Sequence, residues 1–127
     1  MRVLLIVTVG IEAGAGLGLL LAPALVAWLL LGGRLDTAAT VVLARVCGVA
    51  LLSLGVACWL ARNDGTSSAA RGLVAAMGLY NAAVVALLVY AGTVAGLSAI
   101  GLWPAVVLHI GMAAWCLAIL RARRTHP

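Results

Sequence analysis

The chain has 127 residues, of which 66% are hydrophobic and only 9% are charged, and its formal net charge is +5. A soluble domain needs a polar surface, with about a quarter of its residues charged, so a soluble fold is excluded. In hydrocarbon, only helices or a closed barrel pair every backbone donor and acceptor internally. Long continuous apolar runs with little two-residue alternation predict helices.

The first apolar run extends from Val3 to Leu31, which is longer than one membrane crossing requires. Pro23 interrupts this run, because a proline inside a helix removes a hydrogen bond and clashes with the preceding turn. We therefore predict a span over residues 3–21, followed by residues 23–31 as an outer extension or an interfacial helical turn. Three further spans are predicted over residues 38–61, 72–91 and 102–120. The expected fold is all-α, with one integral membrane domain of four transmembrane helices over residues 1–127.

The placement of arginine predicts the orientation, because cytoplasmic loops carry an excess of basic residues. All eight basic residues are arginines, and outside the spans only Arg34 lies on the side opposite the termini. The side of the termini carries six: Arg2, Arg62, Arg71, Arg121, Arg123 and Arg124. Both termini are therefore expected to be cytoplasmic. The basic tail is interpreted as a topology signal and a contact for anionic lipid, and no nucleic-acid partner is expected.

Each predicted span holds one strongly polar position at or near the midplane of the membrane. These positions are Glu12, Arg45, Asn81 beside Tyr80, and His109. An ionised side chain alone at that depth costs several kcal/mol, so such side chains turn inward and pair. We expect an ion pair between Glu12 and Arg45, with hydrogen bonds from the other three. The network is either a structural clamp or part of a proton or ligand site.

Small residues recur on two faces of the first span and on one face of the second. Thr8, Glu12 and Gly16 form one stripe, and a second stripe nearly opposite is a small-xxx-small packing surface made of Gly10, Gly14 and Gly18. That second surface is expected to pack against a neighbouring helix or against a second copy of the chain. In the second span a 3,4 spacing typical of a left-handed helix pair connects Arg45, Gly48, Leu52, Gly55 and Trp59.

The sequence offers little for metal or enzyme chemistry. His109, Met112 and Cys116 share a helical face and would suit copper(I), but they form a weak signal without a repeated spacing. His109 is expected to be an interhelix hydrogen-bonding residue, with a proton relay or a haem or metal ligand as alternatives. We expect no cofactor. No nucleophile motif, phosphate loop, CxxC or HExxH occurs, so an enzyme is not expected.

Four stretches carry a resemblance that covers nearly the whole chain: EAGAGLGLLLAPALVAWLLLG, ARVCGVALLSLGVACWLAR, AARGLVAAMGLYNAAVVALLVYAG and GLWPAVVLHIGMAAWCL. They resemble a group of small bacterial four-helix membrane proteins. The resemblance implies a bacterial inner-membrane location but no activity. It implies recurring residues at Glu12, Pro23, Arg45, Gly48, Tyr80, Asn81, Pro104 and His109.

The length, the four spans and the glutamate in the first span are also similar, more loosely, to small multidrug-resistance transporters, which act as dimers. The aromatic-rich substrate surface of those transporters is absent here, and Arg45 is a candidate counter-ion for Glu12. Three functions are therefore predicted, in this order. The first is a self-associating scaffold, accessory subunit or assembly protein, indicated by a dry, closed bundle. The second is a homodimeric proton-coupled transporter of small molecules, which a polar, water-accessible cavity reaching Glu12 would favour. The third is a haem- or quinone-binding membrane anchor subunit, which extra density in an outer-leaflet cavity beside His109 would favour.

Overall fold

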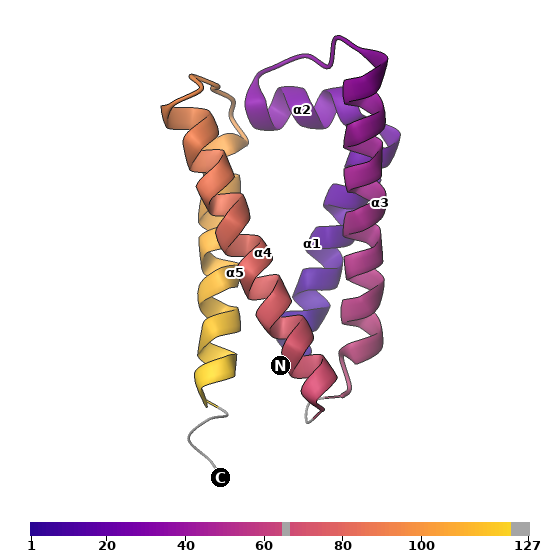
Figure 1. Ribbon diagram of the computed structural model, residues 1–127, viewed down its shortest axis with the longest axis vertical. Coiled ribbons are helices and arrows are strands. Elements are labelled where there is room, and N and C mark those ends of the chain that lie inside the picture. The colour runs from indigo at the N-terminus through magenta and orange to yellow at the C-terminus, as the bar shows by residue number, and fades with distance from the viewer. Residues whose placement is uncertain (65–66, 123–127) are drawn as a thin grey trace.

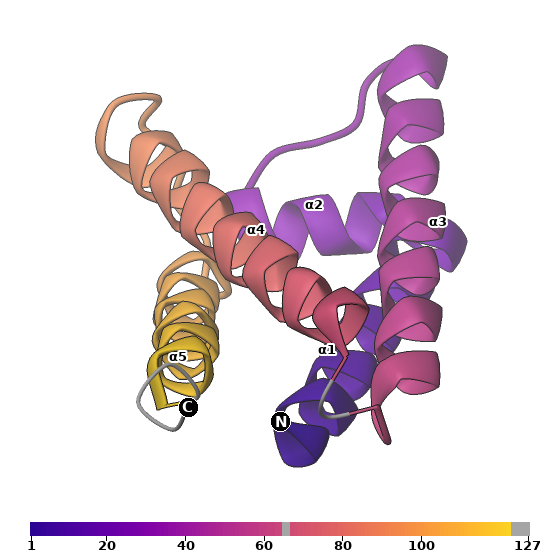
Figure 2. The same cartoon turned by 60° about the horizontal axis from the view of Figure 1, so that its bottom comes forward.

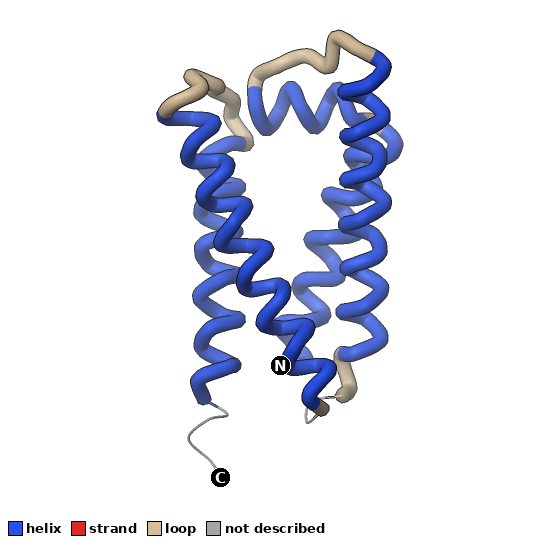
Figure 3. The backbone as a smooth tube through the Cα atoms, viewed as in Figure 1, coloured by secondary structure: helices blue, strands red, loops and turns tan. Residues whose placement is uncertain are grey.

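The computed structural model describes residues 1–64 and 67–122, and within those residues every regular element is a helix (Figure 3). The five helices are α1 (Arg2–Leu21), α2 (Pro23–Leu31), α3 (Ala38–Ala61), α4 (Ser68–Thr93) and α5 (Leu102–Ala122). α1, α3, α4 and α5 are long and apolar enough to cross a membrane. The all-α fold and four potential spans are thus confirmed, and Arg123 and Arg124 of the orientation argument lie outside the described residues.

The ends of the helices follow from local sequence. α1 ends at Leu21, Ala22 leaves the helical conformation, and Pro23 then occupies the first turn of α2, where its missing N–H costs little. The side chain of Ser67 accepts a hydrogen bond from the backbone N–H of Ala70. This cap lets α4 begin at Ser68, four residues before the predicted start.

The helices form two pairs, α1 with α3 and α4 with α5 (Figure 1). α4 leans across, so that its beginning lies close to the first pair and its end lies away from it (Figures 1 and 2). The beginning of α1 and the end of α5 lie at the same end of the molecule, which we call the terminal end. α2 lies across the opposite end, the α2 end, roughly perpendicular to the long helices (Figure 2).

Glycine brings the first pair into backbone contact. A Cβ atom added to Gly16 would lie 2.8 Å from the carbonyl oxygen of Gly48, and one added to Gly48 would lie 2.7 Å from the carbonyl oxygen of Gly16. Only residues without a side chain allow so close a crossing, and small residues play the same part where membrane helices pack closely.

The two pairs meet at both ends of the molecule, and at the α2 end Leu30 and Leu31 of α2 pack against a buried cluster of Leu88, Leu102 and Val106. At the terminal end, a buried core combines residues of all four long helices: Leu4, Leu5, Cys58, Val74, Met77, Met112 and Cys116. At the α2 end, the backbone N–H of Gly101 donates to the carbonyl oxygen of Leu29 over 2.9 Å, which ties α2 to the start of α5. Gly32, with a φ of +69°, ends α2 where its backbone passes close to the carbonyl oxygen of Ser98. Between these two junctions the pairs diverge.

Candidate functional site: a cavity between the helix pairs

A cavity of about 390 Å³ occupies the space between the two helix pairs. Every helix contributes to its lining: Ile11, Glu12, Ala15, Leu19, Val26, Leu29, Leu30, Leu51, Tyr80, Val84, Leu88, Gly101, Ala105, Leu108 and His109. α2 supplies Val26, Leu29 and Leu30, so this short apolar helix closes the cavity toward the α2 end. The sequence prediction missed these wall residues, although the break at Pro23 was the signal for a separate short helix.

The polar side chains of the cavity gather at one end. Glu12, Tyr80 and His109 lie near the middle of α1 and α4 and in the first half of α5, farther from α2 than most other lining residues of those helices, and we call them the polar floor. The lining residues nearer to α2 on the same helices, such as Leu19, Leu88 and Ala105, are aliphatic. The cavity is therefore amphipathic, with its polar groups near the middle of the long helices and its apolar walls rising toward α2.

A hydrogen-bond chain fixes the orientation of the His109 ring. The side-chain N–H of Asn81 donates to the carbonyl oxygen of Met77 over 2.7 Å, which leaves the Asn81 oxygen as an acceptor. That oxygen lies 2.7 Å from Nδ1 of His109, so Nδ1 must carry the hydrogen. In the neutral ring, Nε2 is then the acceptor. The Tyr80 ring meets the His109 ring edge to face, with centroids 6.0 Å apart.

Glu12 is the most buried charged residue of the cavity, with 3% of its surface exposed. Within residues 1–64 and 67–122, its carboxylate has neither a hydrogen bond nor an ion pair. In the same residues no side-chain oxygen or nitrogen is both fully buried and unpartnered. The carboxylate must therefore reach accessible space, and the cavity that Glu12 lines is that space. Nε2 of His109 also has no hydrogen-bond partner among the described residues, so it too must face accessible space.

The expected ion pair between Glu12 and Arg45 is wrong. Gly55 is the residue of α3 that faces Glu12, with 3.6 Å between an added Cβ and the Cβ of Glu12. Arg45 lies ten residues earlier in α3, about 15 Å along the helix, and is exposed on its surface. The depth estimate failed because α3 extends well past the crossing at Gly48, whereas α1 stops at Leu21.

Of the glycines that were expected to pack, some contact a neighbouring helix and others do not. Gly48 and Gly55 pack against α1, as the 3,4 spacing predicted, but Arg45 and Trp59 at the ends of that seam are exposed. On α1 the packing stripe is the one of Thr8, Glu12 and Gly16, all buried. The other stripe packs little: nothing lies within 4 Å of an added Cβ at Gly10 or Gly14, and Gly18 approaches only Val26 of α2. Packing of that stripe against a second copy stays a prediction.

His109, Met112 and Cys116 do not converge on one point. His109 belongs to the polar floor and bonds to Asn81, whereas Met112 and Cys116 are buried in the core at the terminal end. Among the described residues, no group of three or more histidine, cysteine, aspartate or glutamate side chains could hold a metal ion.

The polar residues predicted from the sequence therefore separate into two places. Glu12, Tyr80, Asn81 and His109 meet at the polar floor, and Arg45 stands apart on the outer face of α3. Comparison with protein-family models, with curated proteins and with solved structures gave no match.

Proposed function

We propose that this chain is a multi-pass membrane protein that binds a lipophilic small molecule in the cavity between its helix pairs. Four apolar helices of sufficient length support the membrane location. Trp28, Tyr90 and Trp103 are exposed near the α2 end, where an interfacial aromatic belt would lie. The excess of arginine near the terminal end favours a cytoplasmic position for that end, in a bacterial inner membrane.

The amphipathic cavity is the observation that carries the proposal. A dry, closed bundle would have favoured the scaffold or accessory-subunit role, which the sequence placed first. The apolar walls would surround the hydrocarbon part of a ligand, and a few convergent polar groups would orient its head, as in most small-molecule sites. The head is bound at the polar floor, near the middle of the long helices.

The hydrogen-bonding groups of the polar floor determine which polar head group of a ligand fits best. Nε2 of His109 is an acceptor, and the carboxylate of Glu12 accepts when ionised and has no donor within the described chain. The Tyr80 hydroxyl can donate or accept. A ligand that carries hydrogen-bond donors complements this set best, because each donor satisfies an acceptor that is otherwise unpaired. Lipophilic quinols, phenols and alcohols are such ligands, whereas an oxidised quinone offers only acceptors.

Thermal unfolding in mild detergent tests this proposal, because a ligand that binds only the folded state raises Tm. The probes are a decyl-substituted quinol, its quinone and dodecane. The quinol should raise Tm more than the quinone, and dodecane should have the smallest effect. Ala105→Phe, which fills the cavity, should abolish the quinol effect, whereas Ala83→Phe on the exposed face of α4 should retain it. Equal effects of all three probes, or an undiminished effect in Ala105→Phe, would refute the proposal.

A proton-coupled transporter is the second candidate, and the unpaired carboxylate of Glu12 favours it. Such a carboxylate, accessible from the cavity, is placed to exchange a proton for a ligand. Transport would require the cavity to open to both sides of the membrane. Protein in liposomes that carry an internal pH dye distinguishes the two functions: a transporter couples ligand addition to a pH change that Glu12→Gln abolishes, and a binding protein does not.

A further inference from the structure

Arg45 presents a positive charge on the outward face of α3, away from the cavity. It lines a shallow groove with four apolar residues of the same helix: Val42, Val46, Val49 and Ala50. No other helix contributes to this groove, so it opens away from the bundle. Within residues 1–64 and 67–122 the guanidinium has no ion pair or hydrogen bond.

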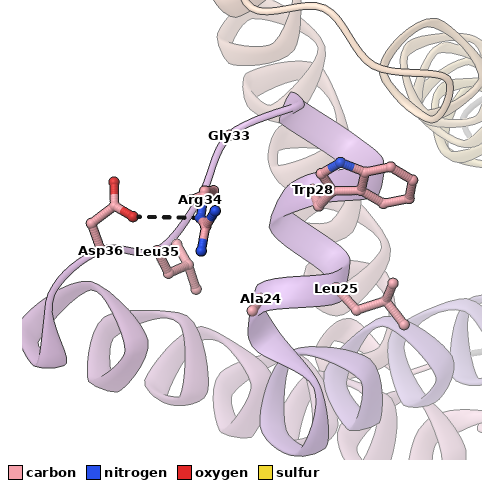
Figure 4. Close-up of a pocket in the computed structure, with 7 residues that line it drawn as sticks. All are labelled: Ala24, Leu25, Trp28, Gly33, Arg34, Leu35 and Asp36. Atoms are coloured by element: carbon pink, nitrogen blue, oxygen red, sulfur yellow. Dashed lines mark ion pairs between the residues drawn. The ribbon is translucent and has the colours of Figure 1, made fainter.

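Within residues 1–64 and 67–122, no carboxylate pairs with Arg45. The chain contains three acidic residues in all. Glu12 is buried at the polar floor, about 15 Å away along α3. In the connection before α3, Oδ1 of Asp36 lies 3.9 Å from Nε of Arg34 (Figure 4). Asp64 lies beyond the opposite end of α3. A second copy of the chain would bring the same three residues, of which its Glu12 would be buried and its Asp36 would lie beside its own Arg34.

The helix geometry directs Arg45 toward the nearer membrane surface. Arg45 follows the start of α3 at Ala38 by seven residues, about 10 Å. Side chains on a helix lean toward its N-terminus, which for α3 is the α2 end. A long arginine side chain in this position can keep its stem along the apolar groove and carry its charged head to the interface. The phosphate groups of lipids lie at that level.

We propose that Arg45 and the groove beside it bind an anionic phospholipid. The guanidinium forms a bidentate contact with the lipid phosphate, the geometry in which arginine exceeds lysine. One acyl chain of the lipid lies along Val42, Val46 and Val49, whose side chains are more than half exposed. The site is independent of the cavity and of its proposed ligand.

Lipid retention in native mass spectrometry tests this site. Purified protein in mild detergent is mixed with equal amounts of phosphatidylglycerol and phosphatidylcholine. The wild type should retain phosphatidylglycerol about fivefold more, the factor expected for one arginine at an anionic membrane surface. Arg45→Gln should reduce this ratio to about one. Arg34→Gln is the matched control, because it removes an arginine that already has Asp36 nearby, and it should leave the preference unchanged.

Two further measurements keep the result decisive. Arg45→Gln removes a charge from a span and should therefore insert and fold normally, which its Tm will show. Val46→Trp should also reduce lipid retention, because it fills the groove and leaves the guanidinium in place. An unchanged preference in Arg45→Gln would overturn the proposal. Displacement of the lipid by millimolar inorganic phosphate would also overturn it, because that result indicates a site for a free anion. Loss of a dimer in Arg45→Gln without any change in lipid preference would overturn it as well.

Discussion

The same four long helices pack together closely in one half of the molecule and separate into two pairs in the other half. At the terminal end, leucine, valine, methionine and cysteine side chains from all four helices fill the centre. Toward α2, the close crossing of Gly16 and Gly48 keeps α1 against α3, and the α4–α5 pair diverges from them. The difference shows that packing within one pair of helices does not close a bundle; side chains directed at the other pair do.

The glycine crossing should be the most sensitive feature of the open half. Gly48→Val adds a Cβ atom that would lie 2.7 Å from the carbonyl oxygen of Gly16 and 2.9 Å from the backbone nitrogen of Leu20. Because backbone atoms cannot move aside separately, we expect a loss of about 3 kcal/mol or more in unfolding free energy. Gly14→Val, where nothing lies within 4 Å, should cost far less. Thermal unfolding in detergent measures both, and equal losses would contradict the crossing.

Leucine truncations compare the closed half with the open half directly. Leu4→Ala removes side-chain atoms from the core, where Leu4 is 1% exposed, and should cost about 2–3 kcal/mol. Leu19→Ala removes atoms from a wall that already borders empty space, and should cost about 1 kcal/mol or less. Chemical denaturation in mixed micelles gives both values. If Leu19→Ala proved as costly as Leu4→Ala, the cavity would be occupied or closed.

The Asn81–His109 hydrogen bond lies where the two halves meet, and a double-mutant cycle isolates its contribution. Asn81→Leu and His109→Phe each remove one partner, and the double variant removes both. Interhelix hydrogen bonds in membranes contribute about 0.6–1.7 kcal/mol, so we expect a coupling energy of about 1 kcal/mol. Additive single effects would show that the 2.7 Å contact contributes nothing to stability.

Glu12→Gln should have the smallest effect of the four. The carboxylate has no partner in the described part of the chain, and glutamine has nearly the same shape. We expect Tm to change little, with unfolding free energy within about 0.5 kcal/mol of the wild type, as for substitutions without a named structural cost. A loss of about 3–5 kcal/mol would indicate a broken buried ion pair and would restore the original prediction of a clamp with Arg45.

Hydropathy and proline were sufficient to predict most of the fold. The four long apolar segments and the break at Pro23 are local properties of the sequence, and both appear in the structure. The inward stripe of Thr8, Glu12 and Gly16 was also visible. His109 was expected to be an interhelix hydrogen-bonding residue, and it bonds to Asn81. The hydrogen bonds expected from Tyr80, Asn81 and His109 to a Glu12–Arg45 pair are not among the contacts of the described residues.

What the sequence could not provide was the register and tilt between helices. Placing Arg45 opposite Glu12 required both spans to begin at the same level, but Glu12 lies opposite Gly55. The choice between two glycine stripes on α1 depended on which face met α3, and both stripes have the same spacing. The cavity arises from the divergence of two helix pairs, which no single segment encodes.

The pairing of α1 with α3, and of α4 with α5, also bears on how the chain is made. The ribosome synthesises α1, α2 and α3 before α4, so the glycine crossing can form as soon as α3 is complete. α4 and α5 then follow as a helical hairpin that already buries its own shared face. Two separately expressed fragments, residues 1–64 and 67–127, should therefore each insert and then reassociate. The cavity between the two pairs would form only at that last step of biogenesis.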